Sequence, residues 1–286
     1  MVNLYVLGKK GLIALSKLDM LYRKNIKSVI IGSDKNIDND FSSEIIKVCQ
    51  DFKLNYQFQN HTSEYTAKYS VAIGWRWLIN DDSNLIVFHD SILPHYRGFN
   101  PLVTALINGD SEIGVTALKG SKEYDKGEII EQKIVPVTYP LKIEKAIDLI
   151  STQYANLLNS IFNKLIKDNL KSYPQDSSKV SYSLWRDEDD YKIDWSLDAL
   201  KIKRFIDAVG FPYKGAYTIY NGKKLIIKNA EIVADVNIAN RTPGKVIFKE
   251  NNSYTIVCGK GLLKIKSFYD SNNMEVRLNK FRLRLK

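Results

Sequence analysis

The sequence is poor in cysteine: Cys49 and Cys258 are its two cysteines, and they lie far apart. A disulfide scaffold or a cysteine-based metal cluster needs several cysteines at close spacing, so the sequence predicts neither. No run of about 18 apolar residues occurs, and the first residues lack the long apolar segment of a secretory signal peptide. Internal repeats and low-complexity segments are also absent. These absences predict a cytoplasmic protein with no metal centre and no membrane partner.

The composition is that of a globular protein with a basic surplus. The chain has 286 residues, of which 44% are hydrophobic, and this favours two domains with real cores. The net charge is +10, and residues 181–286 carry 20 Lys and Arg against 12 Asp and Glu. Such a surplus is typical of proteins that bind nucleic acid or phosphorylated substrates. The lysines are scattered, however, as on an ordinary lysine-rich surface.

The stretch with the densest pattern covers residues 88–101, FHDSILPHYRGFNP. The preceding residues LIVF predict a buried strand, because they are apolar and mostly branched. The following residues PLVTALI predict a helix with Asn100 as N-cap and Pro101 at its first position. His89 therefore lies where a strand ends, which is where ligands bind in an open α/β sheet. Taken alone, it is more simply interpreted as a satisfied histidine at a strand end.

A second stretch, residues 114–130 (GVTALKGSKEYDKGEII), gives His89 a partner. It predicts a strand, a charged loop and another strand. Together the two stretches resemble the formyltransferases that use 10-formyltetrahydrofolate, whose pattern is H, SLLP, YRG, P, GVT and D-x-G-[DE]-I-[IL]. The spacing of 36 residues from His89 to Asp125 also fits that family. The matching elements are His89, Ser91-Ile92-Leu93-Pro94, Tyr96-Arg97-Gly98, Pro101, Gly114-Val115-Thr116 and Asp125-Lys126-Gly127-Glu128-Ile129-Ile130.

The resemblance implies an active site with two catalytic residues. His89 would stabilise an oxyanion and transfer a proton, and Asp125 would orient the imidazole and deprotonate an amine. The family's folate pocket implies contacts of the co-substrate N10-formyltetrahydrofolate with Trp75, Arg76, Trp77, Leu93 and Tyr124. For the acceptor, the implied contacts are Ser91, Pro94, Tyr96, Arg97 and Gly98. The two tryptophans could instead form a lid over the core.

One position departs from the family. Members carry an asparagine two positions before the histidine, and Val87 stands there in this chain. That asparagine helps to bind the formyl oxygen, and the loss of one oxyanion donor costs about 100- to 1000-fold in rate. Either another donor replaces it, with Asn100 and His95 as the nearby polar candidates, or the enzyme is slow or inactive.

The rest of the pattern predicts an α/β chain. Strands and loops alternate over the first 130 residues, as in a largely parallel sheet with helices on its faces. By resemblance, residues 1–180 form a Rossmann-like formyltransferase domain. Residues 142–167 predict a long amphipathic helix, and residues 173–179 predict a polar linker. Short alternating runs after residue 215 predict about five strands of a small antiparallel barrel, similar to the family's OB-like C-terminal domain, within residues 181–286.

An acidic run, residues 185–194 (WRDEDDYKID), precedes the predicted barrel. It can be interpreted as a metal site or as a solvated helix start, since acidic groups favour helix N-termini. Its end resembles a D-x-x-I-D-W stretch that opens the family's C-terminal region, here Asp190, Ile193, Asp194 and Trp195. The second interpretation needs no metal.

Two branches of the family have this layout. One formylates methionyl-tRNA, and the other formylates an amino group of a nucleotide-linked sugar for surface polysaccharide such as the O-antigen of lipopolysaccharide. The tRNA branch carries a long basic loop after its second strand, whereas residues 32–38 (GSDKNID) are short and mildly acidic. This loop favours a nucleotide-sugar substrate over tRNA, although the basic C-terminal part argues the other way. A non-catalytic folate- or nucleotide-binding homologue is a third reading because of Val87, and an exposed edge of the barrel could support a homodimer.

Overall fold

The computed structural model describes residues 1–34, 39–59, 66–79, 84–278 and 280–286. The chain divides into two compact units. The first comprises residues 1–102, 111–137 and 145–184, and the second comprises residues 103–110, 138–144 and 185–286. Our proposal for the two domains is residues 1–180 and residues 181–286. Among the described residues, no helix combines the length and the low charge content that crossing a bilayer requires.

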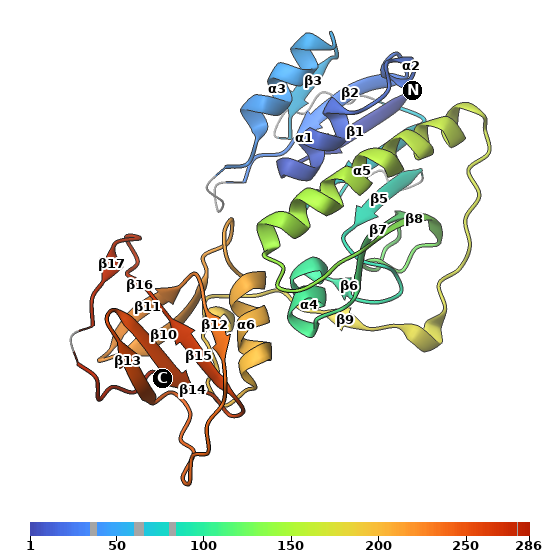
Figure 1. The fold of residues 1–286 in the computed structure, drawn as a ribbon. Coiled ribbons are helices and arrows are strands. Elements are labelled where there is room, and N and C mark those ends of the chain that lie inside the picture. The colour runs from blue at the N-terminus through green and yellow to red at the C-terminus, as the bar shows by residue number, and fades with distance from the viewer. Residues whose placement is uncertain (35–38, 60–65, 80–83, 279) are drawn as a thin grey trace. The chain divides into compact units, whose positions relative to one another are not determined.

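A seven-stranded sheet forms the centre of the first unit, with the strand order β3-β2-β1-β4-β5-β7-β8 (Figure 1). The first five strands in this order pair in parallel, while β7 pairs antiparallel with β5 and with β8. The prediction of a largely parallel α/β sheet is therefore confirmed. A short loop joins β7 to β8, and such a connection allows an antiparallel pair alone. The strands are β1 (Val2–Val6), β2 (Ile26–Ile31), β3 (Tyr56–Phe58), β4 (Tyr69–Ile73), β5 (Leu85–His89), β7 (Glu112–Lys119) and β8 (Ile129–Pro136).

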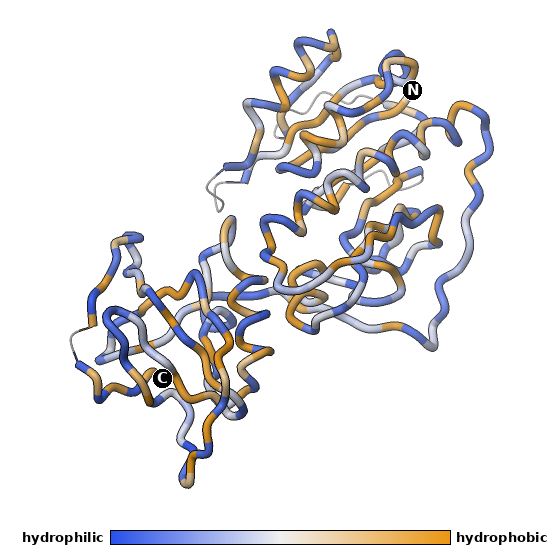
Figure 2. Tube along the Cα trace, viewed as in Figure 1, coloured by the Kyte–Doolittle hydropathy of each residue, from blue (hydrophilic) through white to orange (hydrophobic). Residues whose placement is uncertain are grey.

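Helices pack on this sheet through their apolar faces. The long helix predicted over residues 142–167 is confirmed as α5, and Figure 1 shows it beside α1 and next to β5. Its buried side chains recur at helical spacing: Ala146, Ile147, Ile150, Tyr154, Leu157, Leu158 and Ile161. Hydrophobic residues line the strands and alternate with hydrophilic ones along α5 (Figure 2). The helices of the first unit are α1 (Gly8–Ser16), the short and unburied α2 (Met20–Arg23), α3 (Ser42–Asp51) and α5 (Ile143–Ile166). Most of α4 (Pro101–Asn108) belongs to the second unit, which includes residues 103–110.

The segment after α5 is no free linker, so that part of the prediction is wrong. Residues 172–183, which we call the strap, run along the first unit. Within the strap, β9 (Tyr182–Ser183) pairs in parallel with β6 (Arg97–Gly98), and Tyr173 exchanges two main-chain hydrogen bonds with Ile129. The polar, turn-rich composition that suggested a linker instead supplies side chains that bind neighbouring loops.

The second unit contains two antiparallel sheets of four strands, with the orders β10-β11-β16-β17 and β12-β15-β14-β13. The eight strands among its described residues exceed the predicted five, and two of them, β16 and β17, hold just two residues each. The hairpin predicted at Asn221 and Gly222 is confirmed, and both residues have the positive φ that such a tight turn needs, 49° and 74°. The elements are α6 (Ala199–Ala208), β10 (Ala216–Tyr220), β11 (Lys223–Ile227), β12 (Glu231–Val233), β13 (Val246–Glu250), β14 (Ser253–Val257), β15 (Leu262–Ile265), β16 (Phe268–Tyr269) and β17 (Glu275–Val276).

Candidate active site

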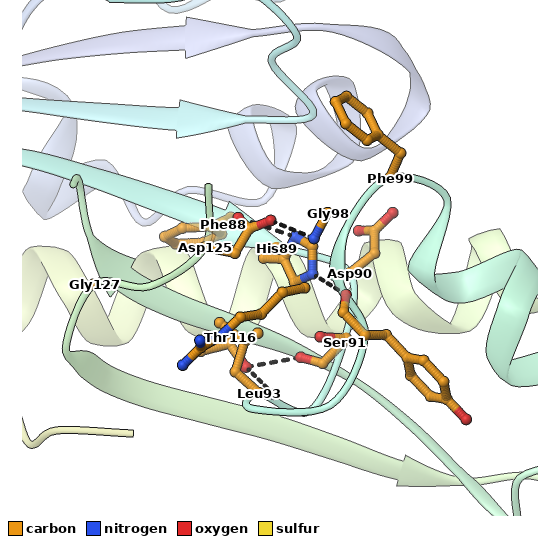
Figure 3. Close-up of polar contacts among 12 residues, drawn as sticks. Phe88, His89, Asp90, Ser91, Leu93, Gly98, Phe99, Thr116, Asp125 and Gly127 are labelled. Carbon is orange, nitrogen blue, oxygen red and sulfur yellow. Dashed lines mark hydrogen bonds and ion pairs between the residues drawn. The ribbon is translucent and has the colours of Figure 1, made fainter. Parts of the chain in front are cut away.

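His89 is the last residue of β5, at the edge where the parallel strands end. Only 7% of the residue is exposed. Its Nδ1 lies 3.3 Å from Oδ1 of Asp125, and its Nε2 lies 2.8 Å from the carbonyl oxygen of Tyr96 (Figure 3). Both neighbours are acceptors, and each neutral tautomer of histidine donates through one nitrogen alone. The tautomer of the neutral ring therefore decides which of the two neighbours receives its N–H.

Asp125 lies in the loop between β7 and β8, with φ of 55°. Its Oδ2 accepts a hydrogen bond of 2.8 Å from the main-chain N–H of Gly98, while Oδ1 faces His89 (Figure 3). The antiparallel pairing of β5 with β7 brings the two residues together, although 36 positions separate them in the chain. The side chains predicted to be catalytic thus meet, and a carboxylate in this position can orient an imidazole.

The loop after β5 is held by buried hydrogen bonds. The hydroxyl of Thr116 donates to the carbonyl of Ser91 (2.7 Å), and the amide of Gln132 donates to the carbonyl of Leu93 (2.9 Å). The Ser91 hydroxyl donates to the carbonyl of His95 (2.7 Å). Ser91 and Leu93 are 4% and 2% exposed, so these two predicted ligand contacts shape the loop and offer almost no surface to a ligand.

Val87 lies in an apolar environment. Its partly buried side chain packs against Leu93, Leu118 and Ile129. Val87 itself carries hydrocarbon where the family has an amide, so either another residue supplies the oxyanion donor or the enzyme is slow or inactive. Of the two polar candidates, His95 is exposed and Asn100 precedes α4 with φ of 49°. Their role as a replacement stays a hypothesis.

Two of the predicted acceptor residues contact the His89–Asp125 pair, Tyr96 through its carbonyl and Gly98 through its N–H, but the polar groups of the set mainly hold the loops in place. Arg97 is 8% exposed, and its guanidinium donates to the side-chain oxygen of Gln175 at 2.8 and 3.0 Å. Tyr96 donates its main-chain N–H to the Ser181 hydroxyl (2.9 Å), and the carbonyl of Pro94 accepts from the N–H of Ser181 (3.3 Å). Gly98 has φ of 100°, and a Cβ there would lie 2.6 Å from the carbonyl of Ser183. The structure therefore presents this set mainly as a scaffold.

The aromatic residues predicted to bind the co-substrate fall into two groups. Trp75 and Trp77 contact each other edge to face at 4.9 Å, and a Cβ on Gly32 would meet their rings at 3.0 and 2.8 Å. They therefore cover the end of β2, which is separated from β5 by two strands. Arg76, between them, forms an ion pair with Asp34.

Tyr124 belongs to a different place, directly before Asp125 in the chain. It is 66% exposed, and its ring lies 5.7 Å from that of Phe99. Phe99 follows Gly98, the residue that donates to Asp125. The Tyr124–Phe99 pair therefore borders the His89–Asp125 site.

A partly buried polar network next to His89 was missed by the sequence reasoning. The carboxylate of Asp90 accepts from the Lys10 ammonium and from the Tyr154 hydroxyl. Burial favours a higher pKa for Asp90, but the Lys10 charge and these two hydrogen bonds outweigh it and lower the pKa. Burial and the negative charges of Asp90 and Asp125 raise the pKa of Tyr154. Nothing local in the sequence links these residues, which come from α1, the end of β5 and α5.

The carboxylates of the acidic run at residues 185–194 bind groups of the protein itself, both near and distant in the sequence. Glu188 pairs with Lys214 and Lys224, and Asp194 accepts from the main-chain N–H of Ser196 (2.9 Å). In the parts of the chain that the structure describes, no group of three or more His, Cys, Asp or Glu side chains is arranged to hold a metal ion. The run begins a short turn, Asp189–Tyr191, rather than a long helix.

Comparison with known proteins identifies the family. Residues 47–160 match the family model described as formyl transferase, and residues 186–282 match the one described as formyl transferase, C-terminal domain. The chain belongs to the formyltransferase family. The order of the two matches agrees with the two-part α/β and antiparallel architecture of the chain.

Individual relatives differ in what they are named for. A methionyl-tRNA formyltransferase of Streptococcus thermophilus is 31% identical over 63% of this chain and 56% of its own length, so the chain spans just over half of that relative. An N-formyltransferase of Helicobacter canadensis, solved with folinic acid and dTDP-3-aminofucose, has a TM-score of 0.72 at 17% identity, over 94% of this chain and 99% of that one. A sugar 3N-formyltransferase, WlaRD, solved with dTDP and 5-N-formyltetrahydrofolate, has a TM-score of 0.62 at 21% identity, over 98% of both chains. The two structural likenesses concern the fold.

Proposed function

We propose that this chain is an N-formyltransferase that moves the formyl group of N10-formyltetrahydrofolate to the primary amine of a nucleotide-linked amino sugar. The observation that carries the proposal is the buried His89–Asp125 pair at the end of β5, with Nδ1 and Oδ1 3.3 Å apart. Family membership indicates the reaction class, formyl transfer. The pair fits this reaction because formyl transfer needs a proton donor and a proton acceptor side by side.

In this proposal each residue of the pair has a separate task. Asp125 accepts the proton that the attacking amine loses, directly or through water, as its new bond to the formyl carbon forms. His89 offers an N–H to the formyl oxygen as negative charge develops there, and it can hand a proton to the departing nitrogen. The co-substrate, when bound, supplies an activated formyl group whose bond to N10 breaks. Protons balance, since one leaves the amine and one reaches N10.

The described residues fit a flat folate ring near the tryptophans. The indole N–H of Trp75 is buried without a hydrogen-bond partner among the described residues, and Trp77 remains 39% exposed. An unpaired donor beside an exposed aromatic face suits a heterocycle that carries acceptor atoms. Tyr124, beside Asp125, offers a second exposed ring.

Two observations support a nucleotide sugar as the acceptor. The structural neighbours named for sugar N-formylation align over 98% or more of their own length, so no large segment of theirs lacks a counterpart here. The loop at residues 32–38 is short in the sequence, although its residues 35–38 lie outside the described residues. Phosphates of tRNA would prefer a basic loop at this place. Such a product would serve surface polysaccharide synthesis.

Methionyl-tRNA is the second candidate acceptor. Sequence relatives at 28% to 31% identity carry that name, and the basic surplus after residue 180 would suit RNA. The matched stretches cover 55% to 61% of the length of those relatives. The name of these relatives is therefore weaker support for the identity of the acceptor than for the type of reaction.

The test measures tetrahydrofolate release from 10-formyltetrahydrofolate with methionyl-tRNA and with a panel of dTDP-, UDP- and GDP-linked amino sugars. We expect turnover with one sugar nucleotide, none with tRNA, and none with His89→Ala. Equal turnover of a free amino sugar would contradict a nucleotide-linked acceptor. Folate binding without turnover of any acceptor would support the non-catalytic reading instead.

A further inference from the structure

The strap contacts both loops that form the candidate active site. The main-chain oxygens of Ser181 and Ser183 accept from the N–H groups of Arg97 (2.9 Å) and Phe99 (3.0 Å). At its other end, Tyr173 pairs with Ile129, which opens β8 directly after the Asp125 loop. Between these two anchors lies Gln175, whose side chain faces both loops.

The side-chain amide of Gln175 makes all of its hydrogen bonds to the two loops. Its Oε1 accepts from Nε and Nη2 of Arg97 at 3.0 and 2.8 Å. Its Nε2 donates to the carbonyl oxygens of Asp125 (2.7 Å) and Gly127 (2.8 Å). An amide has two donors and two acceptor sites, so all four are used. The side chain ties the loop after β5 to the loop after β7.

These contacts hold the carboxylate of Asp125 in position in two ways. Asp125 has φ of 55°, a conformation that costs a non-glycine residue free energy and persists when its surroundings hold it. Gln175 holds the carbonyl of this same residue. Through Arg97, it also holds the strand whose next residue, Gly98, donates to the carboxylate at 2.8 Å. Loss of the amide would therefore loosen the peptide that carries the carboxylate and the N–H that orients it.

We propose that Gln175 is a positioning residue for the reaction, which sets the Asp125 carboxylate against the His89 ring by joining the two loops. The proposal rests on the proposed formyl transfer. Gln175 does not touch the reacting atoms; it acts through Asp125. A displacement of about 1 Å in a catalytic group can lower the rate by about 100-fold, so we expect kcat to fall by up to about 100-fold when the amide is removed.

The variants separate the two halves of the contact. Gln175→Ala removes all four hydrogen bonds. Gln175→Glu can still accept from Arg97 but cannot donate to the two carbonyls. Ser172→Ala is the matched control, because it removes a strap hydrogen bond to Glu128 (2.6 Å) that does not reach Asp125. We expect both Gln175 variants to lower kcat with little change in KM for the acceptor, and Ser172→Ala to keep the wild-type kcat.

A double-mutant cycle with Asp125→Asn decides whether Gln175 acts through Asp125. If it does, Gln175→Ala should cost less than about threefold in kcat once the carboxylate is gone, because coupled residues are not additive. An equal loss in both backgrounds would overturn the proposal. An unchanged kcat in Gln175→Ala with an intact fold would overturn it as well.

The NMR signal of the His89 ring tests this proposal without any catalytic turnover, so its outcome can be separated from that of the proposed function. The chain has three histidines, so the ring signals of a 13C-labelled sample can be assigned with His89→Ala. Gln175→Ala and Gln175→Glu should shift the His89 signal, and Ser172→Ala should not. A shifted signal in a protein that turns over no acceptor would support the positioning and reject formyl transfer. An unshifted signal would reject the positioning.

Discussion

Val87→Asn should raise the rate of formyl transfer. The family's amide at this position binds the formyl oxygen, and Val87 sits on the same strand as His89, two positions before it. One oxyanion donor contributes about 100- to 1000-fold in kcat, or about 2.7 to 4 kcal/mol of barrier. We expect a gain toward the lower end, because the amide has to compete with hydrocarbon neighbours for a usable orientation.

The same substitution should destabilise the fold. Val87 packs against Leu93, Leu118 and Ile129, none of which can pair with an amide through its side chain. A polar group without a partner in such a place costs about 1 to 3 kcal/mol. Urea denaturation should show the loss in the free energy of unfolding. Tetrahydrofolate release, measured with the acceptor that the wild-type protein uses, should show the gain in kcat.

Val87→Leu is the control, since it is apolar and adds no donor. It should lower stability by overpacking and leave kcat without a gain. A folded Val87→Asn variant with unchanged kcat would refute the reasoning, because it would mean that this chain already has an oxyanion donor at full strength. Asn100→Ala and His95→Ala would then identify whether either residue supplies it.

Three further predictions concern charge and the tryptophans. Burial favours a higher pKa for Glu131, but hydrogen bonds from two lysines and a serine lower it from 4.5 to about 2. A depressed folded pKa stabilises the protein above pH 4.5, and this stabilisation is lost as the pH falls toward 2, so Glu131→Gln should flatten acid denaturation in that window. Asp90→Asn leaves the Lys10 ammonium without its carboxylate and should cost about 3 to 5 kcal/mol in urea denaturation, whereas an unchanged midpoint would show that the ion pair contributes nothing. Trp77→Ala should raise KM for the folate by about tenfold, because a stacked ring contributes about 1 to 3 kcal/mol. If the substitution lowers the melting temperature and leaves KM unchanged, Trp77 instead forms part of a lid that covers the core.

Local sequence patterns were sufficient to predict the elements whose structure depends on one segment alone. The apolar spacing that predicted α5 repeats every turn, and a helix responds to that spacing whatever lies elsewhere in the chain. His89 at the end of a buried strand followed from four apolar residues and the polar loop after them. Its pairing with Asp125 came from the ordered motifs of the family rather than from any local rule.

Contacts between distant segments could not be predicted in this way. Gln175 meets Asp125 and Arg97 across 50 and 78 positions of the chain, and its surroundings in the sequence, YPQDSSK, have the composition of a linker. The Asp90 network joins residues that are 80 and 64 positions apart. In each case the hydrogen-bond partner is chosen by where the folded strands place it.

The sequence by itself determined most of the strands and helices and the identity of the two residues proposed to react, because these depend on local spacing and ordered motifs. The tertiary structure alone decided how His89 and Asp125 are held and what surrounds Val87. It also decided which predicted ligand residues are buried in the scaffold. Those properties depend on distances between side chains from separate strands, and such distances exist only once the sheet has formed.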